Sequence, residues 1–210
     1  MLHIKLKWLV TILLISQTQL TFSQKKLNDN TASWKKVEDL EKKGLTKSAK
    51  DEVLIIYEKA VKDREDAQQI KASMYLIKYC NMVEEDSHEN NIFYIDTLVE
   101  QAKAPAKNIL QSMQAEMFWQ YLQSNRWKFY NRTQLVEEKS KDIATWSIEK
   151  LHSTIAALYN TSLKDASTLK ATRLEGLDAI IIKGENTRQL RPTLFDFLAH
   201  RALNYFTNDE

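Results

Sequence analysis

The fold is decided by the stretch from Trp34 to Cys80, which reads WKKVEDLEKKGLTKSAKDEVLIIYEKAVKDREDAQQIKASMYLIKYC. Its apolar residues recur every three or four positions, the spacing of one face of an α-helix. Gly44 stands where a helix needs a left-handed residue after its last turn. We therefore predict short antiparallel helices, each with an apolar stripe that it cannot bury alone. The stripes consist of Trp34, Val37, Leu40, Ala49, Val53, Ile56, Ala60, Ile70, Met74 and Ile77.

The composition of the whole chain supports the same fold class. Glycine and proline, which punctuate β-rich and loop-rich chains, occur only 3 and 2 times in 210 residues. We predict an all-α protein of eight or nine short helices, packed as antiparallel hairpins in a helical-repeat-like array. No fixed sequence period establishes a true repeat. The expected helices cover residues 33–43, 47–62, 65–83, 92–103, a stretch after Pro105, 143–159, 162 to about 184, and a stretch after Thr193.

The first residues have the pattern of an export signal. Lys5 and Lys7 precede the apolar core Trp8–Ile15, and small residues end the segment at Ser23, before Gln24. The apolar core is far shorter than the roughly 18–20 residues that span a bilayer. We therefore expect cleavage before Gln24, in preference to a membrane anchor, and a protein that is periplasmic, exposed on the outer surface or secreted.

These features predict three parts along the chain. Residues 1–23 form a signal peptide, residues 24–33 a flexible N-terminal segment, and residues 34–210 a helical domain. The formal net charge is +2, and the signal contributes two lysines and no acids, so the expected mature chain is neutral. Nucleic-acid binding depends on a basic face, so we expect none, and no membrane association after signal cleavage. The one cysteine, Cys80, cannot form an internal disulfide, and we expect it to be buried.

Two Glu-x-x-His pairs, Glu85/His88 and Glu149/His152, are the only motif that suggests metal chemistry. Two such pairs, with single glutamates from two other helices, build di-iron sites in helical bundles. The first pair falls in the polar run at 84–91, and the second lies beside an apolar stripe. We interpret both as solvated surface pairs and expect no metal, no cofactor and no catalytic residue.

Two aromatic segments are candidates for an interaction surface. Residues 124–133, SNRWKFYNRT, lack helical period and predict an irregular loop that carries Trp127 and Tyr130. Residues 191–206, RPTLFDFLAHRALNYF, predict a terminal helix capped by Thr193 and Asp196. Its apolar arc is wide for a terminal helix. We expect an exposed patch near Phe195, Tyr205 and Phe206, and self-association through it.

Several segments resemble the N-terminal region of the alpha-2-macroglobulin-like proteins of Bacteroidetes. They are NRWKFYNRT (125–133), DIATWSIEKL (142–151) and RPTLFDFLAHRALNYF (191–206), with the opening WKKVEDLEKKGLTKSA and QQIKASMYLIKY. The resemblance covers essentially all of the expected mature chain. It implies an exported protease trap, an endopeptidase inhibitor that closes around its target.

The chain departs from that family at the thioester motif Cys-x-Glu-Gln, because Cys80 is followed by Asn81, Met82 and Val83. The resemblance therefore implies a non-enzymatic helical module with a scaffolding or docking role. Its partners would be proteins: downstream macroglobulin-type domains or a target protease. The alternative is a free-standing periplasmic or surface helical-repeat protein that binds a peptide or glycan.

Overall fold

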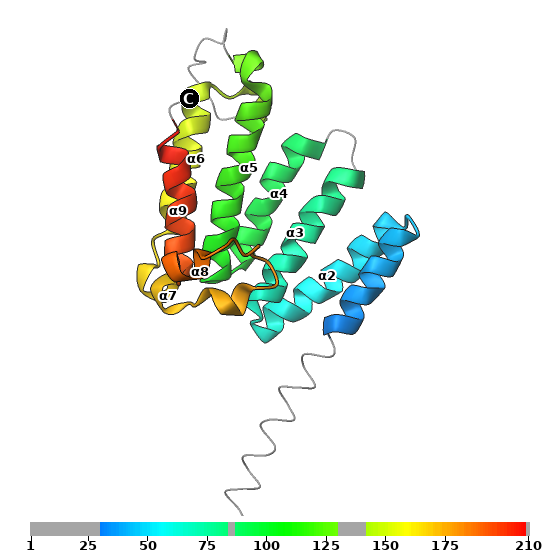
Figure 1. Cartoon of the computed structure of the whole chain (residues 1–210). Coiled ribbons are helices and arrows are strands. Elements are labelled where there is room, and N and C mark those ends of the chain that lie inside the picture. Colours follow the sequence, from blue (N-terminus) through cyan, green and yellow to red (C-terminus); the bar gives the residue numbers. More distant parts are fainter. Residues whose placement is uncertain (1–29, 84–86, 130–141, 209–210) are drawn as a thin grey trace, which may run out of the picture. The chain divides into compact units, whose positions relative to one another are not determined.

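The computed structural model describes residues 30–83, 87–129 and 142–208 (Figure 1). Every regular element in those ranges is helical, so the predicted all-α class is confirmed for the described residues. None of the helices in these ranges combines the length and the apolar character that crossing a membrane requires. The predicted signal peptide lies outside the described residues.

The chain divides into two compact units, Met1–Ile56 and Tyr57–Glu210. The sequence predicts one helical domain at 34–210, whereas the boundary between the units falls inside helix α2 (Thr46–Asp63). Each unit is therefore described separately.

The first unit contains a helix at residues 30–42 and the beginning of α2. Gly44 adopts a φ of 70° after the first helix, as its position predicts. The Gly44 N–H donates to Glu41 O and the Leu45 N–H donates to Leu40 O, which together form a Schellman motif. Residues 30–33, the described part of the segment predicted to be flexible, are helical. The predicted stripe residues Trp34, Val37, Ala49 and Val53 are buried.

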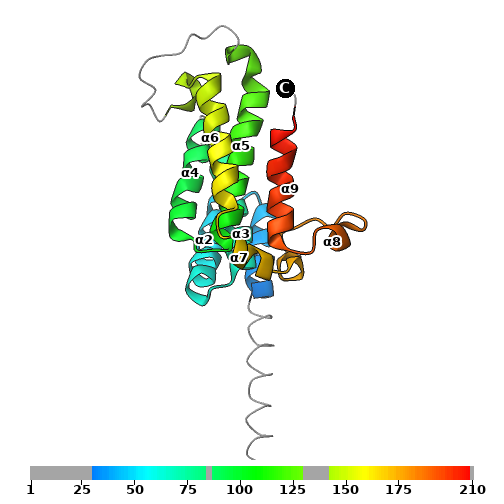
Figure 2. The ribbon, with the colours of Figure 1, turned by 90° about the vertical axis from the view of Figure 1, so that its left-hand side faces the viewer.

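The second unit is built around α5 (Ala106–Phe129). Helix α5 contacts α3 (Asp66–Val83), α4 (Ser87–Gln101), α6 (Ile148–Ser162) and α9 (Leu194–Phe206). Figures 1 and 2 show these helices side by side, with α5 in the middle. The side chains that are fully buried in this core include Phe118, Leu122, Ile143, Leu151, Ile155 and Tyr159.

Two predicted boundaries within this unit are wrong. Helix α4 begins at Ser87, inside the polar run that predicted a break at 84–91. Helix α5 continues to Phe129, although residues 124–133 predicted an irregular loop. The backbone leaves helical geometry only at Asn125, whose side-chain amide donates to Tyr121 O at 2.9 Å. The helical path resumes because Phe129 is buried, with its ring 6.2 Å from that of Tyr121.

The predicted helix at 143–159 is also divided. Residues Ile143–Thr145 form a short 3₁₀ turn, η1, which Asp142 caps by accepting from the Ala144 N–H at 2.9 Å. The α-helix begins only at Ile148, because the Ser147 hydroxyl accepts from the Lys150 N–H at 3.2 Å and starts a new helix there. Two local caps therefore replace one continuous helix.

The predicted helix from Ser162 to about residue 184 is wrong. Ser162 ends α6, and its hydroxyl donates backward to Tyr159 O at 2.7 Å. The Asp165 carboxylate accepts from the Asn108 amide at 3.1 Å instead of closing a capping box. Short helical pieces follow: α7 (Ala166–Ala171), η2 (Leu174–Leu177) and α8 (Thr187–Leu190).

Helix α9 begins as the sequence predicts. The Thr193 hydroxyl accepts from the Asp196 N–H at 3.3 Å, and the Asp196 carboxylate accepts from the Thr193 N–H at 3.0 Å, which completes the capping box. The Leu194 N–H donates to Thr172 O at 2.9 Å, next to an antiparallel bridge between Arg173 and Thr193. These bonds hold the start of α9 against the segment that follows α7.

Candidate functional site

Helix α9 is held against its neighbours by a polar network. Arg201 donates from Nε to the Ser112 hydroxyl at 3.0 Å, and its Nη2 lies 3.5 Å from Glu116 Oε2. The Tyr159 hydroxyl donates to the same carboxylate oxygen at 3.0 Å. Burial, with the negative charge of Glu116, raises the pKa of Tyr159 well above its ordinary value. The network fixes α9 to α5 and α6, and it neutralises the charge of Arg201.

An aromatic cluster lies further along α9. His152 Nδ1 is 2.8 Å from the Tyr205 hydroxyl, and the Trp119 ring is 5.2 Å from the Tyr205 ring, edge to face. Burial lowers the pKa of His152, and the nearby Arg126 charge acts in the same direction. The interpretation of His152 as a solvated surface residue is therefore wrong. It is half-buried because the wide apolar arc of α9 packs over it.

Of the two Glu-x-x-His pairs, only Glu149/His152 has side chains among the described residues. Glu149 is exposed, while His152 turns toward Tyr205. Glu85 lies outside the described residues, and so does the side chain of His88. The described residues contain no group of three or more His, Cys, Asp or Glu that could hold a metal ion.

The residues predicted to form an interaction surface lie in different environments. Phe206 is 51% exposed, and Trp127 is 73% exposed near the end of α5. Phe195 is half-buried, with Lys170 Nζ 4.9 Å from the centre of its ring. Tyr205 belongs to the aromatic cluster, and Tyr130 lies outside the described residues. Exposed apolar surface on α9 is therefore concentrated at Phe206 and Leu203, which is 55% exposed.

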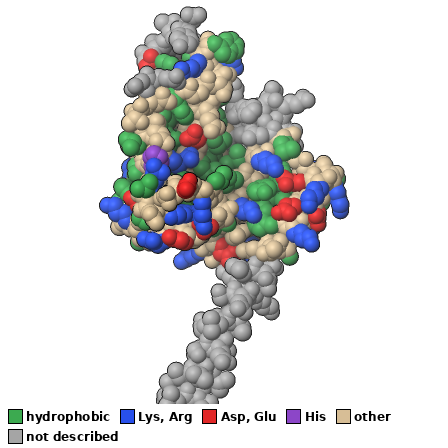
Figure 3. Space-filling view, in the orientation of Figure 1, with side chains coloured by type: hydrophobic (Ala, Val, Ile, Leu, Met, Phe, Trp, Pro, Cys, Tyr) green, Lys and Arg blue, Asp and Glu red, His purple; other side chains and the backbone are tan. Residues whose placement is uncertain are grey.

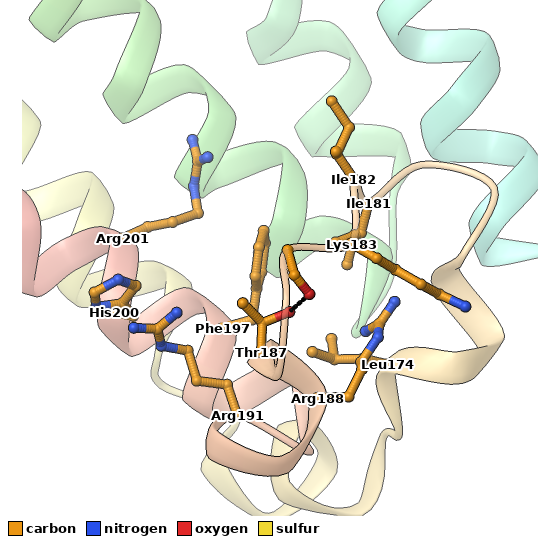
Figure 4. Close-up of a pocket in the computed structure, with 11 residues that line it drawn as sticks. Leu174, Ile181, Ile182, Lys183, Thr187, Arg188, Arg191, Phe197, His200 and Arg201 are labelled. Carbon is orange, nitrogen blue, oxygen red and sulfur yellow. Dashed lines mark hydrogen bonds between the residues drawn. The ribbon is translucent and has the colours of Figure 1, made fainter.

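A pocket of about 130 Å³ lies between the segment that carries α8 and the first turns of α9. We call it the α9 pocket. Its apolar side chains are Leu174, Ile181, Ile182 and Phe197, and its basic side chains are Lys183, Arg188, Arg191, His200 and Arg201. In Figure 4, Arg191 and His200 lie on one side of Phe197, and Arg188 and Lys183 lie on the other.

The charges of the α9 pocket are only partly balanced. Asp178 is shared: one oxygen pairs with Arg188 Nη2, and the other is 2.7 Å from Lys183 Nζ. The hydrogen bond from Lys183 lowers the pKa of Asp178, which is therefore ionised. Arg191 has no carboxylate partner among the described residues. Because Glu116 balances Arg201, two positive charges remain in excess at neutral pH among the lining cations and the two carboxylates that pair with them.

Arg188 is the most shielded of these cations. Its Nε and Nη1 atoms are buried, and no protein atom of the described residues accepts a hydrogen bond from them. Its side chain is 22% exposed, against 58% for Lys183, so water screens the charge of Arg188 less than that of Lys183.

Apolar side chains border this basic pocket on the surface. Ile182 is 97% exposed, and Leu190, adjacent in sequence to Arg191, is 74% exposed. Figure 3 shows Lys and Arg side chains gathered over the part of the molecule where α7 and α8 lie, with hydrophobic side chains between them. Arginine is enriched at protein-binding surfaces, and the exposed Ile182 and Leu190 add apolar surface beside it.

A second pocket, of about 360 Å³, lies at the turn between α2 and α3. Arg64, Asp66 and Lys103 line it, so its charge excess is one, and its cations are not combined with an aromatic floor. Burial raises the pKa of Asp66. The α9 pocket combines the larger charge excess with Phe197 and three aliphatic side chains, and it is the stronger candidate.

Sequence reasoning did not single out the residues of the α9 pocket. One signal was available, because four of the 30 Lys and Arg residues fall within residues 183–201. The predicted helix from Ser162 to about residue 184 includes only Lys183 of these four, and the fold of the segment that joins them was not predicted.

No protein-family model, no curated protein and no solved structure matches the chain. The resemblance to alpha-2-macroglobulin-like proteins therefore stays a prediction.

Proposed function

We propose that this chain is a non-enzymatic helical docking module of an exported protein, and that it binds a segment of a partner polypeptide at the α9 pocket. The observation that carries the proposal is the excess of two positive charges around the apolar side chains of that pocket. A segment with acidic and aliphatic residues complements both features.

The size of the α9 pocket favours a polypeptide partner. Pockets that enclose whole drug-sized ligands measure roughly 300–1,000 Å³, and this one measures about 130 Å³. It has room for one side chain, while the exposed Leu190 offers further apolar contact outside it. A polypeptide segment can use both at once, with one residue in the pocket and its neighbours on the rim.

The proposal includes the features that the resemblance implies. The helices would form an antiparallel hairpin array, and a signal peptide at 1–23 would direct export to the periplasm, the outer surface or the medium. The partners would be downstream macroglobulin-type domains or a target protease. Reading the DNA after the codon for Glu210 separates this role from the alternative, a free-standing binding protein. An open frame that encodes β-sandwich domains supports the first, and a stop codon supports the second.

An array of synthetic peptides tests docking directly. Dodecapeptides attached through their N-termini, in acidic-aliphatic, basic-aliphatic and neutral sets, are probed with the full chain. We expect the acidic-aliphatic set to bind in preference, and the double variant Lys183→Glu/Arg191→Glu to lose that binding. The control Lys62→Glu/Lys107→Glu changes the charge equally but lies outside the pocket lining. Equal binding of all sets, or equal losses in the two double variants, would refute docking at this pocket.

A further inference from the structure

We infer that the α9 pocket recognises an aliphatic carboxylate, the chemistry of a C-terminal Leu, Ile or Val residue of a polypeptide. This inference rests on the proposed docking function and names the group that would enter the pocket. Three observations carry it: the charge excess, the shielded guanidinium group, and the composition of the pocket wall.

The charge excess favours an anion in the pocket. Asp178 pairs with Lys183 and Arg188, and no carboxylate of the described residues pairs with Arg191. Figure 4 shows Arg191 and Arg188 on opposite sides of Phe197, so an anion between them would lie in the field of both guanidinium groups. Guanidinium groups are well matched to carboxylates because their donors lie in one plane.

The buried Arg188 nitrogens also favour an anion in the pocket. A buried donor without an acceptor costs free energy, since it has lost its water and gained no protein partner. Nε and Nη1 of Arg188 are both in that position. Because they are shielded, an anion in the pocket acts on them across a medium of low polarity, where charge attraction is stronger than in water.

The pocket wall selects the rest of the ligand. Leu174, Ile181 and Phe197 present apolar surface that inorganic phosphate would leave uncovered. A dry cavity of about 150 Å³ holds a benzene-sized apolar group. The α9 pocket, at about 130 Å³, is therefore suited to a four-carbon aliphatic group next to the anion.

The test compares free acids with their amides, which have the same shape but no charge. The probes are N-acetyl-leucine, N-acetyl-leucinamide, and the pentapeptide acetyl-Ala-Ala-Ala-Ala-Leu as the free acid and as the amide. Binding to the full chain is followed by nitrogen-15 NMR titration. We expect each free acid to bind at least about tenfold more tightly than its amide, since hydrogen bonds to charged groups are the stronger kind.

Variants locate the binding. Arg191→Gln should weaken binding of the free acids about tenfold, because it removes the cation that lacks a carboxylate partner. Lys183→Gln, which keeps the pair between Arg188 and Asp178, should weaken it less. The matched control is Lys62→Gln, which removes one charge from an exposed position on α2 and should change nothing.

The outcomes separate the inference from the proposed function. Tighter binding of the pentapeptide acid than of N-acetyl-leucine supports a chain terminus as the ligand. Equal binding of the two acids supports a small carboxylate in the same pocket. Amides that bind as well as acids overturn the carboxylate inference and leave docking intact. Displacement by sodium phosphate as effective as displacement by N-acetyl-leucine overturns it too, since the apolar wall would then contribute nothing. If no probe binds, the carboxylate inference fails, and the peptide array still decides whether docking fails.

Discussion

Removing the imidazole of His152 should destabilise the second unit, although the sequence predicted a solvated residue there. The bond from His152 Nδ1 to the Tyr205 hydroxyl measures 2.8 Å. A hydrogen bond of this kind contributes about 0.5–1.5 kcal/mol net. The ring also packs 5.9 Å from Trp119, and aromatic pairs contribute about 0.5–1.5 kcal/mol. Because the site is half-buried and the rings are tilted, we expect His152→Ala to cost about 1–2 kcal/mol in total.

Urea unfolding followed by circular dichroism measures this change. Surface substitutions usually stay within about 0.5 kcal/mol, so the expected loss is distinguishable. Tyr205→Phe, alone and combined with His152→Ala, completes a double-mutant cycle with an expected coupling energy of about 1 kcal/mol. A loss below about 0.5 kcal/mol, together with zero coupling, would show that His152 behaves as a solvated residue and that this reasoning is wrong.

The same histidine predicts a dependence of stability on pH. Burial lowers the pKa of His152 in the folded state, while an unfolded histidine titrates near about 6.5. Below that pH the unfolded state binds a proton that the folded state does not, so protonation favours unfolding. The free energy of unfolding should fall as the pH drops below about 6.5, and His152→Gln should reduce that fall. An identical pH profile in the variant would contradict the assignment.

Three further predictions concern the whole chain. Exported material should begin at Gln24, because Lys5, Lys7 and the core Trp8–Ile15 match a cleaved signal; N-terminal sequencing that finds Met1 would exclude this. Far-ultraviolet circular dichroism should show a helix-dominated spectrum, since helix in the described residues exceeds the usual 30–35%; a β-type spectrum would refute the all-α class. Phe206, which is half-exposed on α9, should promote self-association, so Phe206→Asp should reduce concentration-dependent oligomers in sedimentation without unfolding the chain. A wild-type monomer at every concentration would show that this surface does not self-associate.

Local chemistry determined much of the helical framework. Gly44 ends the first helix, and the reciprocal bonds of Thr193 and Asp196 start α9, because each signal acts through atoms a few residues apart. The predicted helices at 47–62 and 65–83 agree with α2 and α3 to within one residue at each end. Cys80 is buried as predicted, in line with its apolar neighbours.

Tertiary packing decided which faces are buried. Met74 was assigned to an apolar stripe but is 42% exposed, while Ser73 beside it is fully buried. The Ser73 hydroxyl donates to Gln69 O at 2.8 Å, so a polar residue can occupy the buried side of α3 without an unpaired group. A periodicity analysis counts serine as polar, so it assigns Ser73 to the exposed side of α3 and Met74 to the buried side.

The candidate site could not be predicted from local sequence patterns either, because it also depends on tertiary packing. Ser162 and Asp165 have the spacing of a capping box. The side-chain amide of Asn108 on α5, which is 57 residues away in sequence, donates a hydrogen bond to the Asp165 carboxylate instead. Helix α7 ends at Ala171, and the chain continues through the short pieces η2 and α8. The spacing that resembles a cap is present in the sequence. The partner of the Asp165 carboxylate is decided by the packing of α5 against this segment, which no local pattern contains.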